Sequence, residues 1–288
     1  MSIYALTLVI TAAFLHAGWN YLLKKCGGGI GVLTLSAIVA TTMLTPFSLY
    51  LIFANAFAFT PAMIAVILGS GVLHMIYFLL LDRAYRAGGD LSVVYPLARA
   101  TGPLLTIIVA TLVFGERMSA LAVAGALLIG ASALMLTGNP AKLFSKAAGA
   151  GVGFALLCGC MIASYTVWDK QAVAVLLIPP VVFDWGANLS RITMLTPMAM
   201  KREPGAISRA WKDHRKTVIA IGVLSPLSYI LVLTAMVFTP VSYVAPAREL
   251  SILFAALLGA HALKEGDAKR RTIAALGMVL GVSGLALG

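Results

Sequence analysis

Charged residues are scarce in this sequence. Asp, Glu, Lys and Arg make up 11% of the 288 residues, 61% are hydrophobic, and the mean hydropathy is +0.99. A soluble globular domain carries roughly a quarter of charged residues. No polar stretch between the apolar runs is long enough to form a soluble domain. The composition therefore excludes an ordinary soluble protein and predicts a chain embedded in a membrane.

Cysteine and the motifs of catalysis are also scarce. The three cysteines, Cys26, Cys158 and Cys160, are too few for a disulfide framework, and we interpret them as packing residues. The sequence has no HExxH pair and no serine elbow, and Gly27–Gly29 lacks the lysine of a phosphate-binding loop. We therefore expect a protein that is not an enzyme and that holds no metal and no cofactor.

Acidic residues are fewer than basic ones, and the formal net charge is +11. The basic residues lie between the apolar runs, where membrane topology accounts for them, so we expect no nucleic-acid partner. The first apolar run has no basic residue before it, which argues against a cleaved leader. We expect that run to be the first membrane helix.

The apolar runs are long enough to cross a bilayer, which takes about 20 helical residues. Lipid offers no hydrogen-bond partner to the backbone, so such a segment must be helical. The predicted fold is an all-α integral membrane protein with ten transmembrane helices. We place them at residues 3–22, 31–53, 62–82, 91–114, 119–137, 149–168, 174–198, 216–236, 241–262 and 270–287.

Basic residues are distributed very unevenly over the predicted loops. One side carries two of them, Arg117 and Lys170, and the other side carries sixteen. These are Lys24, Lys25, Arg83, Arg86, Lys142, Lys146, Lys201, Arg202, Arg209, Lys212, Arg215, Lys216, Lys264, Lys269, Arg270 and Arg271. Because the richer side faces the cytoplasm, we expect both termini to lie outside it, most simply in a bacterial inner membrane.

The sequence repeats itself at an offset of 149–151 residues. Gly71–Tyr77 resembles Gly222–Ser228, and Ser92–Pro96 resembles Ser242–Pro246. The constant offset favours a true repeat over chance similarity between apolar helices.

Each repeat holds five predicted helices, and in each a loop glutamate, Glu116 or Glu265, precedes the last helix. Five is an odd number, so the two halves would enter the membrane in opposite orientations, a plan common among secondary transporters. We divide the chain into an N-terminal repeat, 1–140, and a C-terminal repeat, 141–288, within one membrane domain.

Two short motifs connect this plan with a known family. Trp19-Asn20 ends the first predicted helix, and Tyr95-Pro96-Leu97-Ala98-Arg99 lies in the fourth. With the five-plus-five arrangement, they resemble the drug/metabolite transporter superfamily in its EamA-like permease branch, over nearly the whole chain. The resemblance implies two repeats around a central cavity that opens alternately to each side. Small four-helix relatives carry an essential acid in their first helix, which this chain lacks.

Polar residues inside membrane spans are energetically costly and are functional candidates. Two helices at matching positions in the repeats carry them at the same i, i+3, i+4 spacing. The first helix has His16, Trp19 and Asn20, and the sixth has Tyr165, Trp168 and Asp169. We take these faces as walls of one cavity, with a role for the two tryptophans in an interfacial aromatic belt equally open.

A second group of candidates follows the prolines of the fourth and ninth helices. Tyr95 and Arg99 flank Pro96, and Arg248-Glu249 follows Pro246. A guanidinium group binds carboxylate or phosphonate through two hydrogen bonds, so the arginines suit an anion site. A buried Arg99–Glu249 ion pair between the halves is an equally weighted alternative.

The seventh helix is the least hydrophobic one. Asp184, Asn188 and Arg191 follow i, i+4, i+7 and form a polar stripe that cannot face lipid. In the third helix, His74 and Tyr77 are further inward candidates.

These features predict a secondary transporter that moves a small polar metabolite by alternating access, with a zwitterion or anion such as an amino acid or aminophosphonate as substrate. The alternatives are an exporter of cationic or quaternary-amine compounds and a passive channel. The expected partners are the substrate, the bilayer and a coupling proton, carried by Asp184 or Glu249, then by His16 or His74. Both a monomer and a homodimer stay open.

Overall fold

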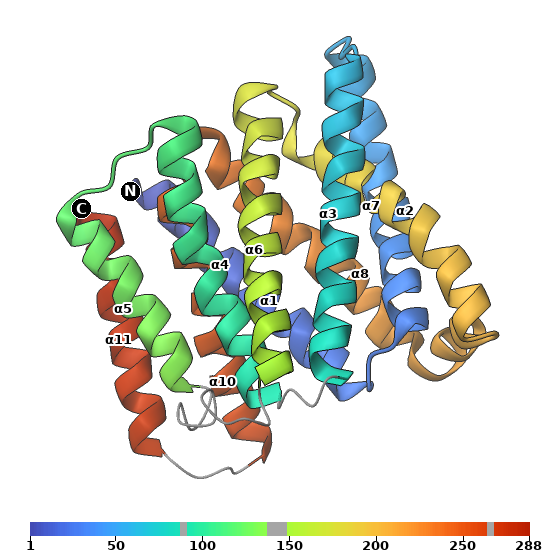
Figure 1. The fold of residues 1–288 in the computed structure, drawn as a ribbon. Helices are drawn as coiled ribbons and strands as arrows, with labels where there is room; N and C mark the ends of the chain where they lie inside the picture. The colour runs from blue at the N-terminus through green and yellow to red at the C-terminus, as the bar shows by residue number, and fades with distance from the viewer. Residues whose placement is uncertain (87–90, 137–148, 264–267) are drawn as a thin grey trace.

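The computed structural model describes residues 1–86, 91–136, 149–263 and 268–288, with some side chains next to the gaps left out. Within these ranges all regular structure is helical, and the helices pack into one bundle (Figure 1). The elements are α1 (Ile3–Lys25), α2 (Ile30–Ala54), α3 (Pro61–Arg86), α4 (Leu91–Phe114), α5 (Ala120–Leu136), α6 (Gly149–Lys170), the π-helical turn η3 (Gln171–Val175), α7 (Pro180–Arg202), α8 (Ala206–Phe238), α9 (Val241–Arg248), α10 (Leu250–Leu263) and α11 (Ala268–Leu287).

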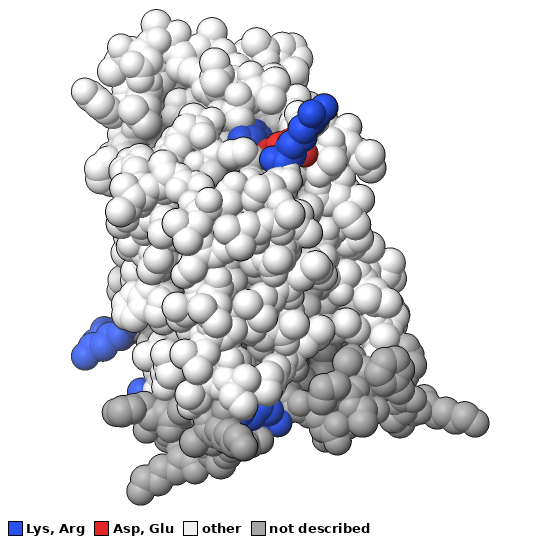
Figure 2. Space-filling view, turned by 90° about the vertical axis from the view of Figure 1, so that its left-hand side faces the viewer, with Lys and Arg blue, Asp and Glu red and all other residues white. Residues whose placement is uncertain are grey.

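Six of the described helices are long and apolar enough to cross a membrane: α1, α2, α3, α4, α6 together with η3, and α8. α5 and α11 are apolar over shorter stretches. Figure 2 shows a face of the molecule with lysine, arginine and acidic side chains together towards the upper end, lysine and arginine side chains towards the lower end, and a broad uncharged band between them. This pattern is that of a multi-pass membrane protein.

Two predicted boundaries differ from the structure. The seventh helix begins at Pro180, not at residue 174, because Leu177 takes a left-handed φ of 54° and two prolines follow. Proline is favoured in the first turn of a helix and lacks the N–H that would continue an earlier one. Much of the predicted loop 199–215 is helical, since α7 runs to Arg202 and α8 starts at Ala206.

The predicted single helix over 241–262 is divided in two. α9 ends at Arg248, and α10 starts at Leu250. Pro246 lacks the N–H that would bond to the carbonyl of Ser242. After it the chain tightens, and Glu249 donates its N–H to the carbonyl of Pro246, three residues back, at 3.0 Å. The break places Arg248 and Glu249 at helix ends inside the bundle.

Glycine allows the closest helix contacts. α5 and α11 lie side by side (Figure 1), and an added Cβ at Gly125 would meet the carbonyl oxygen of Gly281 at 2.5 Å. α4 and α6 approach equally closely, where Gly159 faces Thr101. By contrast, a Cβ at Gly153 would meet no atom of the described residues within 4 Å, so this glycine is not at a close helix contact there. Small residues at interfaces are typical of membrane bundles.

We predict that Gly125→Ala destabilises the bundle, whereas the matched control Gly153→Ala does not. Overpacking a close contact costs about 1–3 kcal/mol, while alanine in an open helical position gains up to about 1 kcal/mol over glycine. The midpoint of thermal unfolding in detergent, measured for both variants, checks this. Equal midpoints for the two variants would contradict the close α5–α11 packing.

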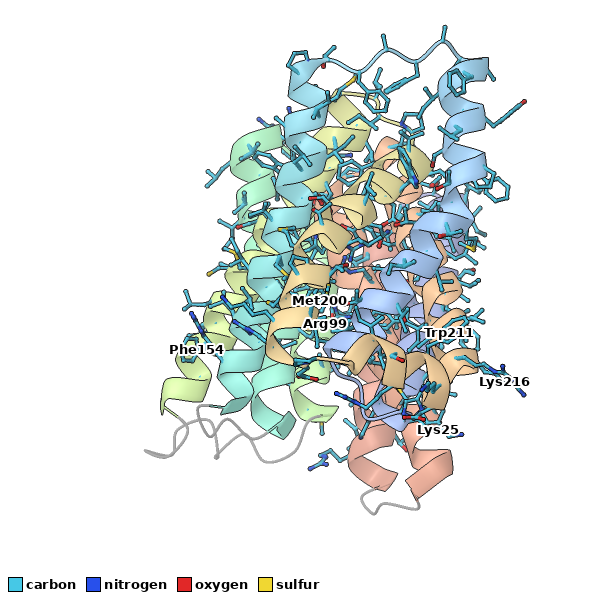
Figure 3. The ribbon with its side chains drawn as sticks, turned by 90° about the vertical axis from the view of Figure 1, so that its right-hand side faces the viewer. Lys25, Arg99, Phe154, Met200, Trp211 and Lys216 are labelled. Carbon is cyan, nitrogen blue, oxygen red and sulfur yellow. The ribbon has the colours of Figure 1, made fainter. Side chains whose placement is uncertain are left out.

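The two chain ends lie at the same end of the bundle (Figure 1). The N-terminal ammonium of Met1 donates a hydrogen bond to the carbonyl of Ala286 at 3.1 Å. The basic end lies opposite: Figure 3 shows Lys25 and Lys216 at the lower end of the molecule, whereas Arg99 lies within the bundle. In the structure the chain termini and the two lysines Lys25 and Lys216 therefore lie at opposite ends of the bundle.

Candidate functional site

A buried ion pair joins the two halves of the chain. Arg99 on α4 lies with its Nε 3.0 Å from Oε2 of Glu249, and both side chains are almost fully buried. The Arg99 Nη2 also donates to the hydroxyl of Ser251 at 2.9 Å and lies 3.5 Å from Nε2 of His16. This is the ion pair that the sequence offered as the alternative to a ligand role for Arg99.

Arg248 differs from Arg99 in its contacts. Its side chain is buried, with 4% exposed, and its Nε and Nη2 have no hydrogen-bond partner in the described part of the chain. Arg248 is the last residue of α9, where the helix dipole is negative, and Glu249 precedes α10, whose first turn is positive. The helix break therefore favours both charges at this depth, but it leaves Nε and Nη2 of Arg248 without an acceptor in the described residues.

The polar stripe of α7 forms a network of its own. Asn188 donates from Nδ2 to Oδ2 of Asp184 at 2.8 Å, and Arg191 donates from Nη2 to Oδ1 of Asn188 at 2.8 Å. The Arg191 Nη2 lies 3.9 Å from Oδ1 of Asp184. Asp184 and Asn188 are buried, and Arg191 is about one-fifth exposed, so the stripe faces inward as predicted.

An aspartate and aromatic rings from three helices form a third group. Tyr229 on α8 donates its hydroxyl to Oδ2 of the fully buried Asp169 on α6. His74 on α3 stacks on Tyr165 with ring centroids 4.1 Å apart, and it meets Tyr229 edge-on at 5.7 Å. The Nδ1 of His74 lies 2.8 Å from the carbonyl oxygen of Ser70.

Arg248 connects these groups electrostatically. Its charge acts on His16 beside the Arg99–Glu249 pair, and also on His74 and Tyr229 of the aromatic group. We refer to the three groups and Arg248 together as the polar centre. Its members are His16, Ser70, His74, Arg99, Tyr165, Asp169, Asp184, Asn188, Arg191, Tyr229, Arg248, Glu249 and Ser251.

Some predicted site residues lie outside the polar centre. Trp168 is 39% exposed and donates its indole N–H to the carbonyl of Val66 at 2.8 Å, so it covers the outside of α3. Asn20 bonds to its own helix, with Nδ2 2.8 Å from the carbonyl oxygen of His16. Trp19 packs against apolar residues of α2 and α8, although its ring lies 4.9 Å from that of His16.

Two predicted tyrosines have less defined positions. Tyr77 lies at the edge of the aromatic group, with its ring centroid 6.1 Å from that of Tyr165. Tyr95 is in the first turns of α4, and its side chain lies outside the described part of the structure.

The sequence did not single out three residues of the polar centre, namely Ser70, Tyr229 and Ser251. Hydroxyl residues are common in membrane helices, so these carry little signal on their own. The sequence places Asp169 on the polar face of the sixth helix with Tyr165 and Trp168, but does not single it out as a proton carrier. A buried acid at a matched position was the signal that could have selected it.

Two charged side chains form hydrogen bonds to helix ends at the end of the bundle where the termini lie. The carboxylate of Glu116 accepts the backbone N–H groups of Val241 and Ser242 at 2.8 and 2.9 Å, at the start of α9. The Lys170 ammonium donates to the carbonyls of Met236 and Thr239, at 2.5 and 3.1 Å, at the end of α8. Each charge thus neutralises the helix dipole that it faces.

Known proteins match this chain in sequence and in fold. Residues 149–287 match the model of a transporter family. With the apolar helices, the match indicates a multi-pass membrane transporter. The family is the EamA-like transporter family, part of the drug/metabolite transporter superfamily, and its model covers residues 149–287, just under half of the chain. It is a family of transporters and not of enzymes, which agrees with the expectation from the sequence.

A solved structure described as "Crystal structure of protein" shares the fold over nearly its whole length. The TM-score is 0.77, with 18% sequence identity over 98% of this chain and 97% of the other. No curated protein matches the chain.

Proposed function

We propose that this chain is a secondary transporter that moves a small zwitterionic or anionic metabolite across the cell membrane by alternating access. The substrate would be of the amino-acid or aminophosphonate type. Its substrate site would be the part of the polar centre around Arg248, between an N-terminal repeat, 1–140, and a C-terminal repeat, 141–288.

Arg248 carries this proposal. A buried charge is costly unless a partner compensates it, and two nitrogens of this guanidinium, Nε and Nη2, have no hydrogen-bond partner in the described residues. A carboxylate or phosphonate of a substrate would supply a two-oxygen acceptor of matching shape. Arg99, by contrast, already contacts Glu249 and Ser251. We therefore assign the anionic group of the substrate to Arg248 and a structural role to Arg99.

The pairing of helices supports two inverted repeats. If α1, α2 and α3 correspond to α6, α7 and α8, then α4 corresponds to α9 with α10, and α5 to α11. Each major contact then has a counterpart. α1–α8 matches α3–α6, α4–α6 matches the contact of α1 with α9 and α10, and α2–α8 matches α3–α7. α9 and α10 together would make one crossing, which gives the ten crossings of the proposed plan.

Two other functions compete with this one. A carrier of quaternary amines would need an aromatic box without arginine, but Arg248, Arg191 and Arg99 all lie in the polar centre. A passive channel would show flux that does not saturate. An inverted repeat with a divided helix favours alternating access over a channel.

The proposal is tested in two steps. Purified protein is screened by thermal unfolding against amino acids, aminophosphonates, organic acids and quaternary amines. Compounds that raise the midpoint are then used as labelled probes in liposomes. We expect zwitterions or anions to stabilise the protein and to show saturable uptake with counterflow. Stabilisation by quaternary amines alone would support the cation exporter, and non-saturating flux would support the channel.

The proposed orientation places both termini outside the cytoplasm. A cysteine placed before Ser2 should then react with a membrane-impermeant thiol reagent in intact cells. The background lacks the native cysteines Cys26, Cys158 and Cys160. Asp213→Cys, an exposed position at the basic end, is the matched control and should react only after permeabilisation. The reverse pattern would invert the proposed topology.

A further inference from the structure

Three carboxyl groups lie inside the bundle, and their partners differ. Glu249 faces the guanidinium of Arg99 at 3.0 Å. Asp184 accepts a hydrogen bond from Asn188 and lies 3.9 Å from Arg191. For both, a neighbouring cation compensates the negative charge. Asp169 has no such ion pair within the described residues, although the sequence alone favoured the other two acids as proton carriers.

The contacts of Asp169 are those of a group built to change its protonation state. Its side chain is 0% exposed. The hydroxyl of Tyr229 donates to Oδ2, and the hydroxyl of Ser70 lies beside the carboxyl group. The second oxygen, Oδ1, has no hydrogen-bond partner in the described part of the chain. A buried carboxylate without a cation is costly, and binding a proton removes the charge.

Titratable and charged groups from several helices surround Asp169. α3 contributes His74, and α8 contributes Tyr229. From α7, the charges of Arg191 and Asp184 reach the carboxyl group and oppose each other.

The other charged side chains near α6 interact with groups other than the carboxyl group of Asp169. On α9, Arg248 acts on Tyr229, and Glu249 is paired with Arg99 of α4. On α6 itself, Lys170 directs its ammonium to the end of α8. Hydrogen-bond donors and two opposing charges therefore surround Asp169, without a fixed cation in contact within the described chain.

We propose that Asp169, with Tyr229 as its hydrogen-bond partner, is the proton-binding group that couples transport to a proton gradient. This inference rests on the proposed transport function. The step is reversible protonation: the carboxylate takes up one proton from the side to which it is open and releases it to the other. No other bond is formed or broken. The Tyr229 hydroxyl donates to the carboxylate and can turn to accept from the carboxylic acid.

Only one of the two repeats carries a titratable residue at this position. The counterpart of Asp169 at an offset of 149 is Asn20, an amide that cannot titrate and that bonds to its own helix. A proton site of this kind therefore exists in only one half of the described bundle. The expected coupling is one proton per cycle at this position.

Infrared spectroscopy tests proton binding without any substrate. Purified protein in lipid nanodiscs is titrated from alkaline to acidic buffer, and the carboxylic acid C=O band is recorded. We expect one band to be lost in Asp169→Asn and kept in the control Asp213→Asn, an exposed aspartate. Tyr229→Phe, which keeps the carboxyl group, should move the same band to higher frequency. A spectrum unchanged in Asp169→Asn and in Tyr229→Phe would overturn the proposal.

Transport in liposomes tests coupling. 2-Aminoethylphosphonate and L-alanine are the labelled probes. For a probe that the wild type exchanges, Asp169→Asn should keep that exchange but lose accumulation driven by a pH gradient. Loss of exchange in the folded variant would make Asp169 a substrate residue and overturn the proposal. If the wild type exchanges neither probe, the substrate proposal fails for these compounds, and the infrared result still decides whether Asp169 binds a proton.

Discussion

Arg248→Ala is expected to lower the affinity for the zwitterionic or anionic substrate by about a hundredfold. A lost hydrogen bond to a charged group typically removes a few kcal/mol, and every ~1.4 kcal/mol corresponds to a tenfold change in affinity. Arg248→Lys keeps the charge but not the two parallel N–H groups, so its affinity should be intermediate. Binding is measured with the labelled compound that stabilises the wild type most.

A stability measurement separates this role from a structural one. The Nε and Nη2 of Arg248 lack a hydrogen-bond partner within the described chain, so replacing this side chain should leave the unfolding midpoint unchanged or raise it. Arg202→Ala, at an exposed position at the end of α7, is the matched control and should change neither affinity nor stability. If Arg248→Ala folds and binds the compound as tightly as the wild type, the anion site lies elsewhere, and the quaternary-amine carrier becomes the leading function.

Glu249→Leu is expected to destabilise the protein by about 3–5 kcal/mol, the usual effect of removing one member of a buried ion pair. The reason is the charge left behind: Arg99 would stay buried next to Arg248 with no acid between them. Arg99→Met should cost less, because the carboxylate of Glu249 can still interact with Arg248. The midpoint of thermal unfolding in detergent measures both effects.

The double variant Arg99→Met with Glu249→Leu provides the decisive comparison. Replacing a buried pair by apolar side chains of similar size is often neutral, so the double variant should recover most of the loss. Glu203→Leu, the same type of change at an exposed site, controls for the added apolar side chain. A double variant no more stable than Glu249→Leu would show that the pair does not link α4 to the break between α9 and α10.

The sequence predicted the membrane class, the resemblance to the family and much of the polar centre, because lipid leaves few alternatives. A charged side chain in an apolar span has to face inward, and Asp184, Arg191, Arg99, Arg248 and Glu249 all do. The residue pattern within one helix could not show which side chain from another helix each charged residue would pair with. Ion pair and ligand site were open for Arg99 until the structure placed Glu249 beside it, 150 residues away.

Aromatic residues were harder to assign from the sequence. Trp168 and Tyr165 lie three residues apart on one helix, yet Tyr165 is 6% exposed and Trp168 is 39% exposed. An α-helix turns about 100° per residue, so side chains three residues apart point in directions only about 60° from each other. A small rotation of the helix therefore decides which ring faces outward. The boundary at the seventh helix failed for another reason. Apolar residues 174–178 fit a membrane span by composition, but the left-handed Leu177 and the two prolines end the helical path.

The contact between Met1 and Ala286 has a consequence for chain connectivity. Because Met1 contacts Ala286, two residues before Gly288, a short linker could join the two ends without crossing the bundle. The exposed turn Glu203–Gly205, between α7 and α8, offers a place to open the chain again. Such a circular permutant would begin with α8, end with α7, and keep every helix contact described above. We therefore expect the packed bundle to tolerate a different order of the helices along the chain.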